Sequence, residues 1–189
     1  MRTTNALKDR PVPLFPRDEG GCLYDPRVRE AVERSGETAH GLQMEAVAAL
    51  RLASKKLHLA MERYADKHGL SEGRMYVLFR LLSEPGHRLP LGELAETLLL
   101  APRTITGLID TLERDGWVSR VNDPQDRRSI YAQLTPEGVA RIDQLRRQAA
   151  LQQSSLTHDF SDQQLLQLRD LCLRIVQNLE SAEGDPHAG

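Results

Sequence analysis

The sequence has little of what stabilises secreted or metal-binding proteins. It contains only two cysteines, Cys22 and Cys172, which lie too far apart for the ligand spacing of a zinc site. Its six histidines also show no spacing typical of metal ligands. The stretch from Met1 to Lys8 lacks the apolar core of a signal peptide. We therefore expect a protein of the reducing cytoplasm that needs no metal and no cofactor.

Long hydrophobic runs and a strong net charge are also missing. No apolar stretch reaches the length that spans a bilayer, so we expect no membrane partner. The formal net charge is −2, without the basic excess that many nucleic-acid-binding proteins show. What matters for DNA binding is the field at the contact surface, so a few well-placed arginines are enough. Glycine-rich phosphate loops and nucleophile motifs are absent, and we expect no enzymatic activity.

What the sequence does contain is a series of helical patterns. Residues 1–24 hold three prolines and two glycines, which is typical of an extended arm with little structure of its own. Asp25-Pro26 is a helix start signal and predicts a short helix that reaches Arg34. A long helical pattern follows over Leu42–His68. Another pattern covers Glu72–Ser83, which completes the first half of a mainly helical chain.

The next two patterns predict a helix-turn-helix. Leu91–Leu98 is a short helix, a tight turn follows, and Pro102–Arg114 is an amphipathic helix with Pro102 in its first turn. Its apolar residues recur at helical spacing, namely Ile105, Leu108, Ile109 and Leu112. Its opposite face is small, hydroxylated and basic near the N-terminus, with Arg103, Thr104, Thr106, Gly107, Asp110, Thr111 and Arg114. Such a face can enter a DNA major groove.

Gly107 is unusual at this place, because glycine inside a helix costs about 1 kcal/mol relative to alanine. Close approach of the helix backbone to DNA would compensate for this cost. Alternatively, Gly107 is a tolerated defect or makes room for a neighbouring helix. The sequence leaves these three readings open.

After Asp115-Gly116 the hydrophobic period changes from 3.6 to 2. Trp117–Val121 and Ile130–Leu134 are predicted strands, and the polar segment between them is rich in turn residues. The pair forms a β-hairpin beside the helix-turn-helix, which is a wing. Thr135-Pro136 starts a helix that runs to about His158. The capping box Ser161–Gln164 starts the last helix, which runs to about Ala182 with a broad apolar face.

These residues together resemble the MarR family of bacterial regulators. The resemblance covers about residues 42–180 and rests on the order and spacing of Leu94-Ala95, Thr104-x-Thr106, Asp110-x-Leu112-Glu113, Gly116, Arg120, Asp123-Pro124-x-Asp126-x-Arg128 and Leu134-Thr135-x-x-Gly138. It implies a mainly α fold with a small β-hairpin wing, a winged helix-turn-helix that forms a homodimer. Family members bind pseudo-palindromic double-stranded operators, usually as repressors. Many are released by a small phenolic or other aromatic acid, and others respond to oxidation or to metal.

The resemblance also implies a domain organisation. Residues 71–135 would form the DNA-binding winged helix-turn-helix, and residues 37–70 with 136–182 the helical dimerisation region. Residues 1–36 would be an N-terminal arm with a short helix, and residues 183–189 a tail. The arm is longer than is usual in the family. It would extend the dimer interface, cover a pocket or be partly disordered, and the sequence does not decide among these.

Carried over residue by residue, the resemblance implies DNA contacts. Arg103, Thr104, Thr106 and Gly107 stand where family members face the major groove. With Arg128 and the added candidates Thr111 and Arg127, they form the expected DNA-binding set. Arg128 stands where a wing arginine enters the minor groove, whose negative potential attracts a guanidinium. Asp126 stands where an acid holds that arginine through paired hydrogen bonds. Arg127 is expected to contact a phosphate.

Several residues have a structural reading beside the functional one. We expect Trp117 to pack in the core. Asp110 and Glu113 are expected to pair with arginines of their own domain, such as Arg114 or one in the wing. Cys22 is a candidate redox sensor, although a reactive thiol needs cationic or helix N-terminal neighbours. A different class of function also remains, in which the winged helix docks a protein and the dimer is a scaffold.

Overall fold

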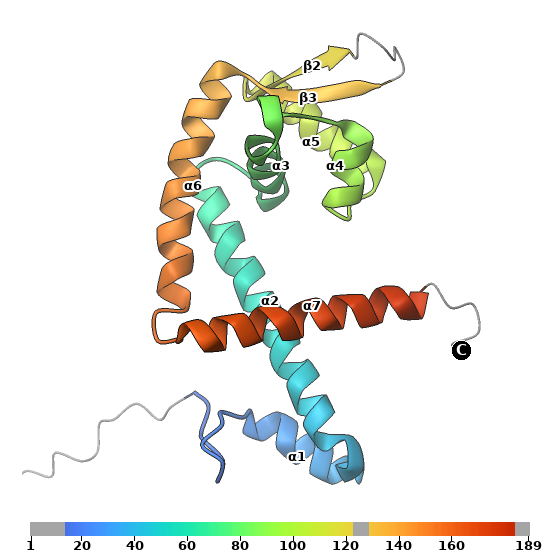
Figure 1. The fold of residues 1–189 in the computed structure, drawn as a ribbon, viewed down its shortest axis with the longest axis vertical. Coiled ribbons are helices and arrows are strands. Elements are labelled where there is room, and N and C mark those ends of the chain that lie inside the picture. Colours follow the sequence, from blue (N-terminus) through green and yellow to red (C-terminus); the bar gives the residue numbers. More distant parts are fainter. Residues whose placement is uncertain (1–13, 123–128, 184–189) are drawn as a thin grey trace, which may run out of the picture. The chain divides into compact units, whose positions relative to one another are not determined.

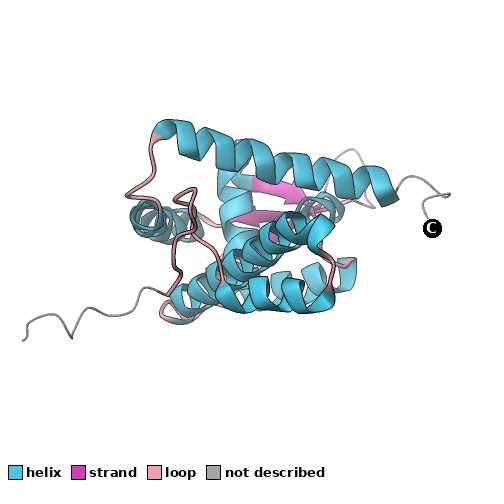
Figure 2. Cartoon of the chain, turned by 90° about the horizontal axis from the view of Figure 1, so that it is seen from below, coloured by secondary structure: helices cyan, strands magenta, loops and turns pink. Residues whose placement is uncertain are grey.

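The computed structural model describes residues 14–122 and 129–183. Helices make up most of the described chain, and the strands of the sheet lie together in one place (Figure 2). The chain separates into two compact units, with the boundary between Glu72 and Gly73.

The first unit is built around the long helix α2, Gly41–Asp66. The predicted short helix is present as α1, Pro26–Ser35, and the Asp25 side chain caps it by accepting a hydrogen bond from the Arg27 N–H. A 3₁₀ turn, Thr38–His40, leads from α1 into α2, and the two helices pack together (Figure 1). Val32 of α1 is buried in this contact, with its side chain close to Gly41.

An ion pair fixes α1 to α2. The Arg29 guanidinium donates two hydrogen bonds to the Glu45 carboxylate, at 3.0 and 2.9 Å, and lies 3.8 Å from the Tyr24 ring centre. The preceding segment is not simply an extended arm, because Arg17 and Leu23 form an antiparallel bridge around a turn. The Asp18 carboxylate closes that turn by accepting from the Cys22 N–H at 2.9 Å. Side-chain to backbone hydrogen bonds of this kind produce no periodic pattern in the sequence, so the turn was not predicted.

The second unit contains the helix-turn-helix and the sheet. Its helices are α3 (Glu72–Ser83), α4 (Leu91–Thr97), α5 (Pro102–Arg114), α6 (Pro136–Leu156) and α7 (Asp162–Glu183). The core is aliphatic and comes from several elements, with Met75, Leu78, Leu81, Leu89, Leu94, Ile105, Ile109, Leu112 and Ile142 fully buried. This packing supplies most of the helix stability, since short isolated helices are marginal in water.

The sheet has one strand more than the sequence predicted. β2 (Val118–Asn122) and β3 (Ile130–Leu134) form the expected antiparallel hairpin. A third strand, β1 (Arg88–Pro90), pairs with the other side of β3 and gives the order β1-β3-β2. β1 was missed because it has three residues, contains a proline and exists only through its long-range pairing.

The two C-terminal helices differ in burial. Helix α6 buries Ile142, Leu145 and Ala149, whereas every described side chain of α7 except the half-buried Cys172 is exposed. The predicted capping box at the start of α7 is confirmed, since the Gln164 side chain accepts from the Ser161 N–H at 2.9 Å. Within the part of the chain that the structure describes, no helix could cross a membrane.

Candidate nucleic-acid interface

Helix α5 presents one buried and one exposed face. Of the predicted apolar stripe, Ile105, Ile109 and Leu112 are fully buried, and Leu108 is half-buried. The expected DNA-facing residues Arg103, Thr104, Thr106 and Gly107 are all exposed, and Thr111 is half-buried. A helix anchored by an aliphatic stripe with a small, polar outer face has the form needed to enter a groove 12 Å wide, which is roughly the width of the B-DNA major groove.

Polar groups at the N-terminal end of α5 are available for a ligand. No ion pair is recorded for Arg103 among the described residues, whereas Arg114 lies against Asp115. The first turn of α5 has Ala101 at its cap position, without a side-chain cap hydrogen bond. The positive end of the helix and an unpaired guanidinium therefore lie together, and both attract phosphate.

The threonine hydroxyls are oriented by the helix itself. Thr106 donates to the Pro102 carbonyl at 3.0 Å, and Thr111 donates to the Gly107 carbonyl at 3.2 Å. With its hydroxyl proton engaged, Thr106 has an oxygen that accepts and a methyl group to offer to a partner. The hydroxyl oxygen can accept a hydrogen bond from an adenine or cytosine amino group, and the methyl group can pack against a thymine methyl.

The surroundings of Gly107 exclude one of its three readings. A Cβ atom built at Gly107 would have no other heavy atom within 4 Å, apart from its own neighbours in the helix. The residue therefore does not make room for a neighbouring helix within the described chain. A tolerated defect and close approach to DNA remain.

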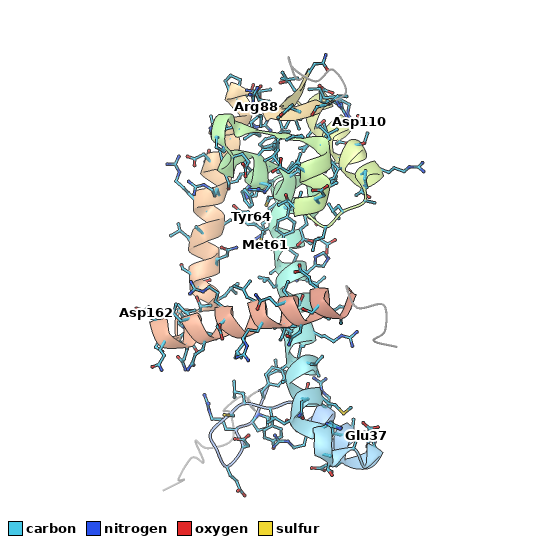
Figure 3. The ribbon with its side chains drawn as sticks, turned by 45° about the vertical axis from the view of Figure 1, so that its right-hand side comes forward. Glu37, Met61, Tyr64, Arg88, Asp110 and Asp162 are labelled. Carbon is cyan, nitrogen blue, oxygen red and sulfur yellow. The ribbon has the colours of Figure 1, made fainter. Side chains whose placement is uncertain are left out.

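The Arg120 clamp, which consists of Arg120 with Asp110 and Glu113, joins the wing to α5. Arg120 of β2 donates from Nη2 to Asp110 at 2.5 Å and from Nη1 to Glu113, and its backbone N–H donates to Glu113 at 2.9 Å. Asp110 lies on the side of α5 that faces β2 (Figure 3). Burial alone would lower the pKa of Arg120, but the hydrogen bonds to both carboxylates outweigh it and raise the pKa. The expected pairing of Asp110 and Glu113 within their own domain is confirmed.

The base of the hairpin is held to the start of α6 by the side chain of Thr135. Thr135 caps α6 by accepting from the Gly138 N–H at 2.9 Å, and its hydroxyl donates to the Gly116 carbonyl at 2.9 Å. A Cβ atom at Gly138 would clash with the Trp117 carbonyl, so only glycine fits there without movement. Trp117 is buried, as predicted, with the Arg141 guanidinium 3.7 Å from its ring centre.

For several expected site residues the functional role stays a prediction. Asp126, Arg127 and Arg128 fall outside the described residues, so their roles stay predictions. Cys22 is exposed on the N-terminal turn, remote in sequence from α5, and its redox role also stays a prediction. No cluster of three or more metal-binding side chains occurs in residues 14–122 and 129–183. Sequence reasoning singled out Arg120 only as part of a motif, and it passed over Leu99 in the turn before α5.

Taken together, the short helix α4, the turn, helix α5 and the β2–β3 hairpin define a winged helix-turn-helix. Solved structures share this fold. The MarR family transcription regulator SP03579 gives a TM-score of 0.67 at 22% identity, over 82% of this chain and 99% of its own. The MepR–DNA complex of S. aureus gives a TM-score of 0.64 at 18% identity, over 70% of this chain and 96% of its own.

Sequence comparison gives the family. The MarR family model matches residues 70–130. The HTH-type transcriptional repressor YetL of Bacillus subtilis (strain 168) is 37% identical over 126 residues, which are 67% of this chain and 73% of the relative. The chain belongs to the MarR family and is a transcriptional regulator rather than an enzyme.

Proposed function

We propose that the chain is a homodimeric repressor that binds a pseudo-palindromic operator through α5 and the wing. Each copy would place the N-terminal part of α5 in a major groove, at half-sites about one helical turn apart. The observation that carries this proposal is the outer face of α5, where Arg103, Thr104, Thr106 and Gly107 are exposed together. The name of the relative YetL, a repressor, supports the direction of regulation. Such a regulator acts on the chromosome, which would place it in the cytoplasm.

Exposed aliphatic residues support the dimer. Helix α7 carries eight large aliphatic side chains that are at least 36% exposed in the single chain, namely Leu165, Leu166, Leu168, Leu171, Leu173, Ile175, Val176 and Leu179. Apolar exposure on this scale marks an interaction surface. Since α2 also exposes Leu42, Val47 and Leu57, we propose that a second copy covers both helices.

Binding to DNA from the gene's own promoter region tests the proposal. We expect wild-type protein to shift this DNA at low salt, and we expect Arg103→Ala to relax the preference for one base pair per half-site. Arg128→Ala is expected to weaken binding by about 1–3 kcal/mol without unfolding the protein. Arg34→Ala, which removes the same charge from α1, is the control and should leave binding unchanged. Uniform weakening of all sequences by Arg103→Ala would make it a phosphate contact instead.

The same experiment separates the competing functions. A protein-interaction scaffold would show no sequence-specific shift with any promoter fragment. A redox sensor acting through Cys22 would lose DNA binding on mild oxidation, and Cys22→Ser would abolish that loss.

We further propose that a small aromatic acid releases the DNA, a step that rests on the family resemblance. The ligand would favour a spacing of the two α5 helices that misses the half-sites. A panel of aromatic acids that leaves operator affinity unchanged would remove this step and leave constitutive binding.

A further inference from the structure

Within residues 14–122 and 129–183, three helices end in the same hydrogen-bonded motif. In each, one residue takes a left-handed backbone conformation and its N–H donates to the carbonyl three residues back. The N–H of the following residue donates to the carbonyl five residues back. The left-handed residues are Gly69 after α2 (φ 70°), Leu99 after α4 (φ 52°) and Gly116 after α5 (φ 75°). The chain therefore uses glycine twice and leucine once for the same backbone task.

Leucine is a poor residue for this position. Its Cβ atom crowds the carbonyl oxygen in the left-handed conformation, which disfavours the folded state by roughly a factor of ten relative to glycine. The side chain recovers nothing by packing, because Leu99 is 92% exposed. Its neighbours Leu98 and Leu100 are half-buried. Strain without an internal benefit points to a role outside the chain.

The position of Leu99 indicates what it contacts. It lies in the turn between α4 and α5, three residues before Pro102 and four before Arg103. The exposed residues next to it on α4, Glu96 and Thr97, are polar, and on its other side the exposed Ala101 and Pro102 lead directly into α5. The exposed face that continues from it along the chain is the α5 face proposed to bind DNA.

We propose that the Leu99 side chain contacts the operator, packing on the deoxyribose groups at the edge of the major groove that α5 enters. The proposal rests on the proposed function. An apolar contact with sugars neutralises no phosphate, so it adds affinity without releasing counterions. It also adds affinity for operator and unrelated DNA alike, since the sugars carry no sequence.

Replacement of Leu99 by residues that suit the left-handed conformation tests this contact. We expect Leu99→Gly and Leu99→Asn to raise the melting temperature, because both relieve the strain. We expect both to weaken binding of the dimer to DNA by about ten-fold. The slope of log affinity against log salt should stay the same. Leu99→Met keeps an apolar side chain and should keep wild-type affinity.

Each other outcome overturns the proposal. If Leu99→Gly stabilises the protein and leaves affinity unchanged, Leu99 makes no DNA contact. If Leu99→Gly weakens binding but Leu99→Asn does not, the loss comes from the flexibility of glycine in the turn. A salt slope that changes by about one would mean that a phosphate contact was lost. Absence of any DNA binding by wild-type protein would instead refute the proposed function, and the two failures are thus distinct.

Discussion

At Gly107 the backbone of α5 lies bare on the exposed face of the helix. Because a methyl group there would meet no other atom of the described chain, Gly107→Ala should stabilise the protein by about 1 kcal/mol. If the bare backbone lies against DNA, the same methyl group would be excluded by the operator, and affinity should fall at least ten-fold. Thermal unfolding and fluorescence anisotropy with labelled DNA measure the two effects. Increased stability with unchanged affinity would make Gly107 a tolerated defect.

The spacing of apolar residues predicts which side chains of a helix are buried and which are exposed, but it predicts no backbone angles. The spacing of the apolar residues in α5 was enough to place Arg103, Thr104 and Thr106 on the outer face, as the structure does. Periodicity contains no information about a left-handed φ, so the turn after α4 was predicted but its strained Leu99 was not. Nor did it predict that Trp117 stays outside the strand. The Trp117 N–H donates to the Leu112 carbonyl and so ends α5 instead of starting β2.

At the scale of elements, the Arg120 clamp couples the wing strand to α5 and neutralises two carboxylates. We expect Arg120→Met to leave Asp110 and Glu113 without a cation beside the DNA, and so to lower operator affinity about ten-fold through repulsion of phosphate. The free energy of unfolding should also fall, but only by about 1–2 kcal/mol. The fall is small because the ion pair between Arg120 and Asp110 is largely exposed and contributes little. Anisotropy titration and thermal unfolding measure both effects.

Two further variants separate charge from positioning. Arg120→Lys keeps the charge but lacks the planar fork that binds two carboxylates at once. Arg120→Met combined with Asp110→Asn and Glu113→Gln removes the repulsion without restoring the clamp. Recovery of affinity in the triple variant would identify electrostatic neutralisation as the role of Arg120. Loss that persists there and in Arg120→Lys would mean that the clamp sets the angle of the wing.

The helices and strands that could be predicted are those marked by local sequence signals, whereas elements that depend on distant partners could not be predicted. Caps and stripes placed α3, α5 and β3 at their observed bounds. β1 depended on a partner strand more than 40 residues away, so no local signal could reveal it. The Arg120 clamp shows the same division. The sequence showed that Asp110 and Glu113 need a cation, and only the fold showed that β2 supplies it.

At the scale of the whole molecule, association of two copies would bury the aliphatic side chains that α7 exposes in the single chain. We expect Leu171→Glu with Leu179→Glu to prevent dimerisation, since burying each leucine contributes roughly 1.5–3 kcal/mol and a dimer contains each twice. The dimer dissociation constant should therefore rise at least about 1,000-fold. Sedimentation or light scattering at micromolar concentration would show monomer. Gln167→Glu with Gln177→Glu, which adds the same two charges per chain on the same helix, is the control and should remain dimeric.

The oligomeric state also determines how the protein binds DNA. A monomer presents one α5 helix and one wing, so it should bind a half-site with the same sequence preference but far lower affinity for the full operator, because linkage of the two halves is lost. A Leu171→Glu, Leu179→Glu variant that is monomeric yet binds the full operator as tightly as wild type would separate DNA binding from dimerisation. Wild-type protein that is itself monomeric at micromolar concentration would mean that α7 is covered by something other than a second copy, and the two-half-site geometry would then no longer apply.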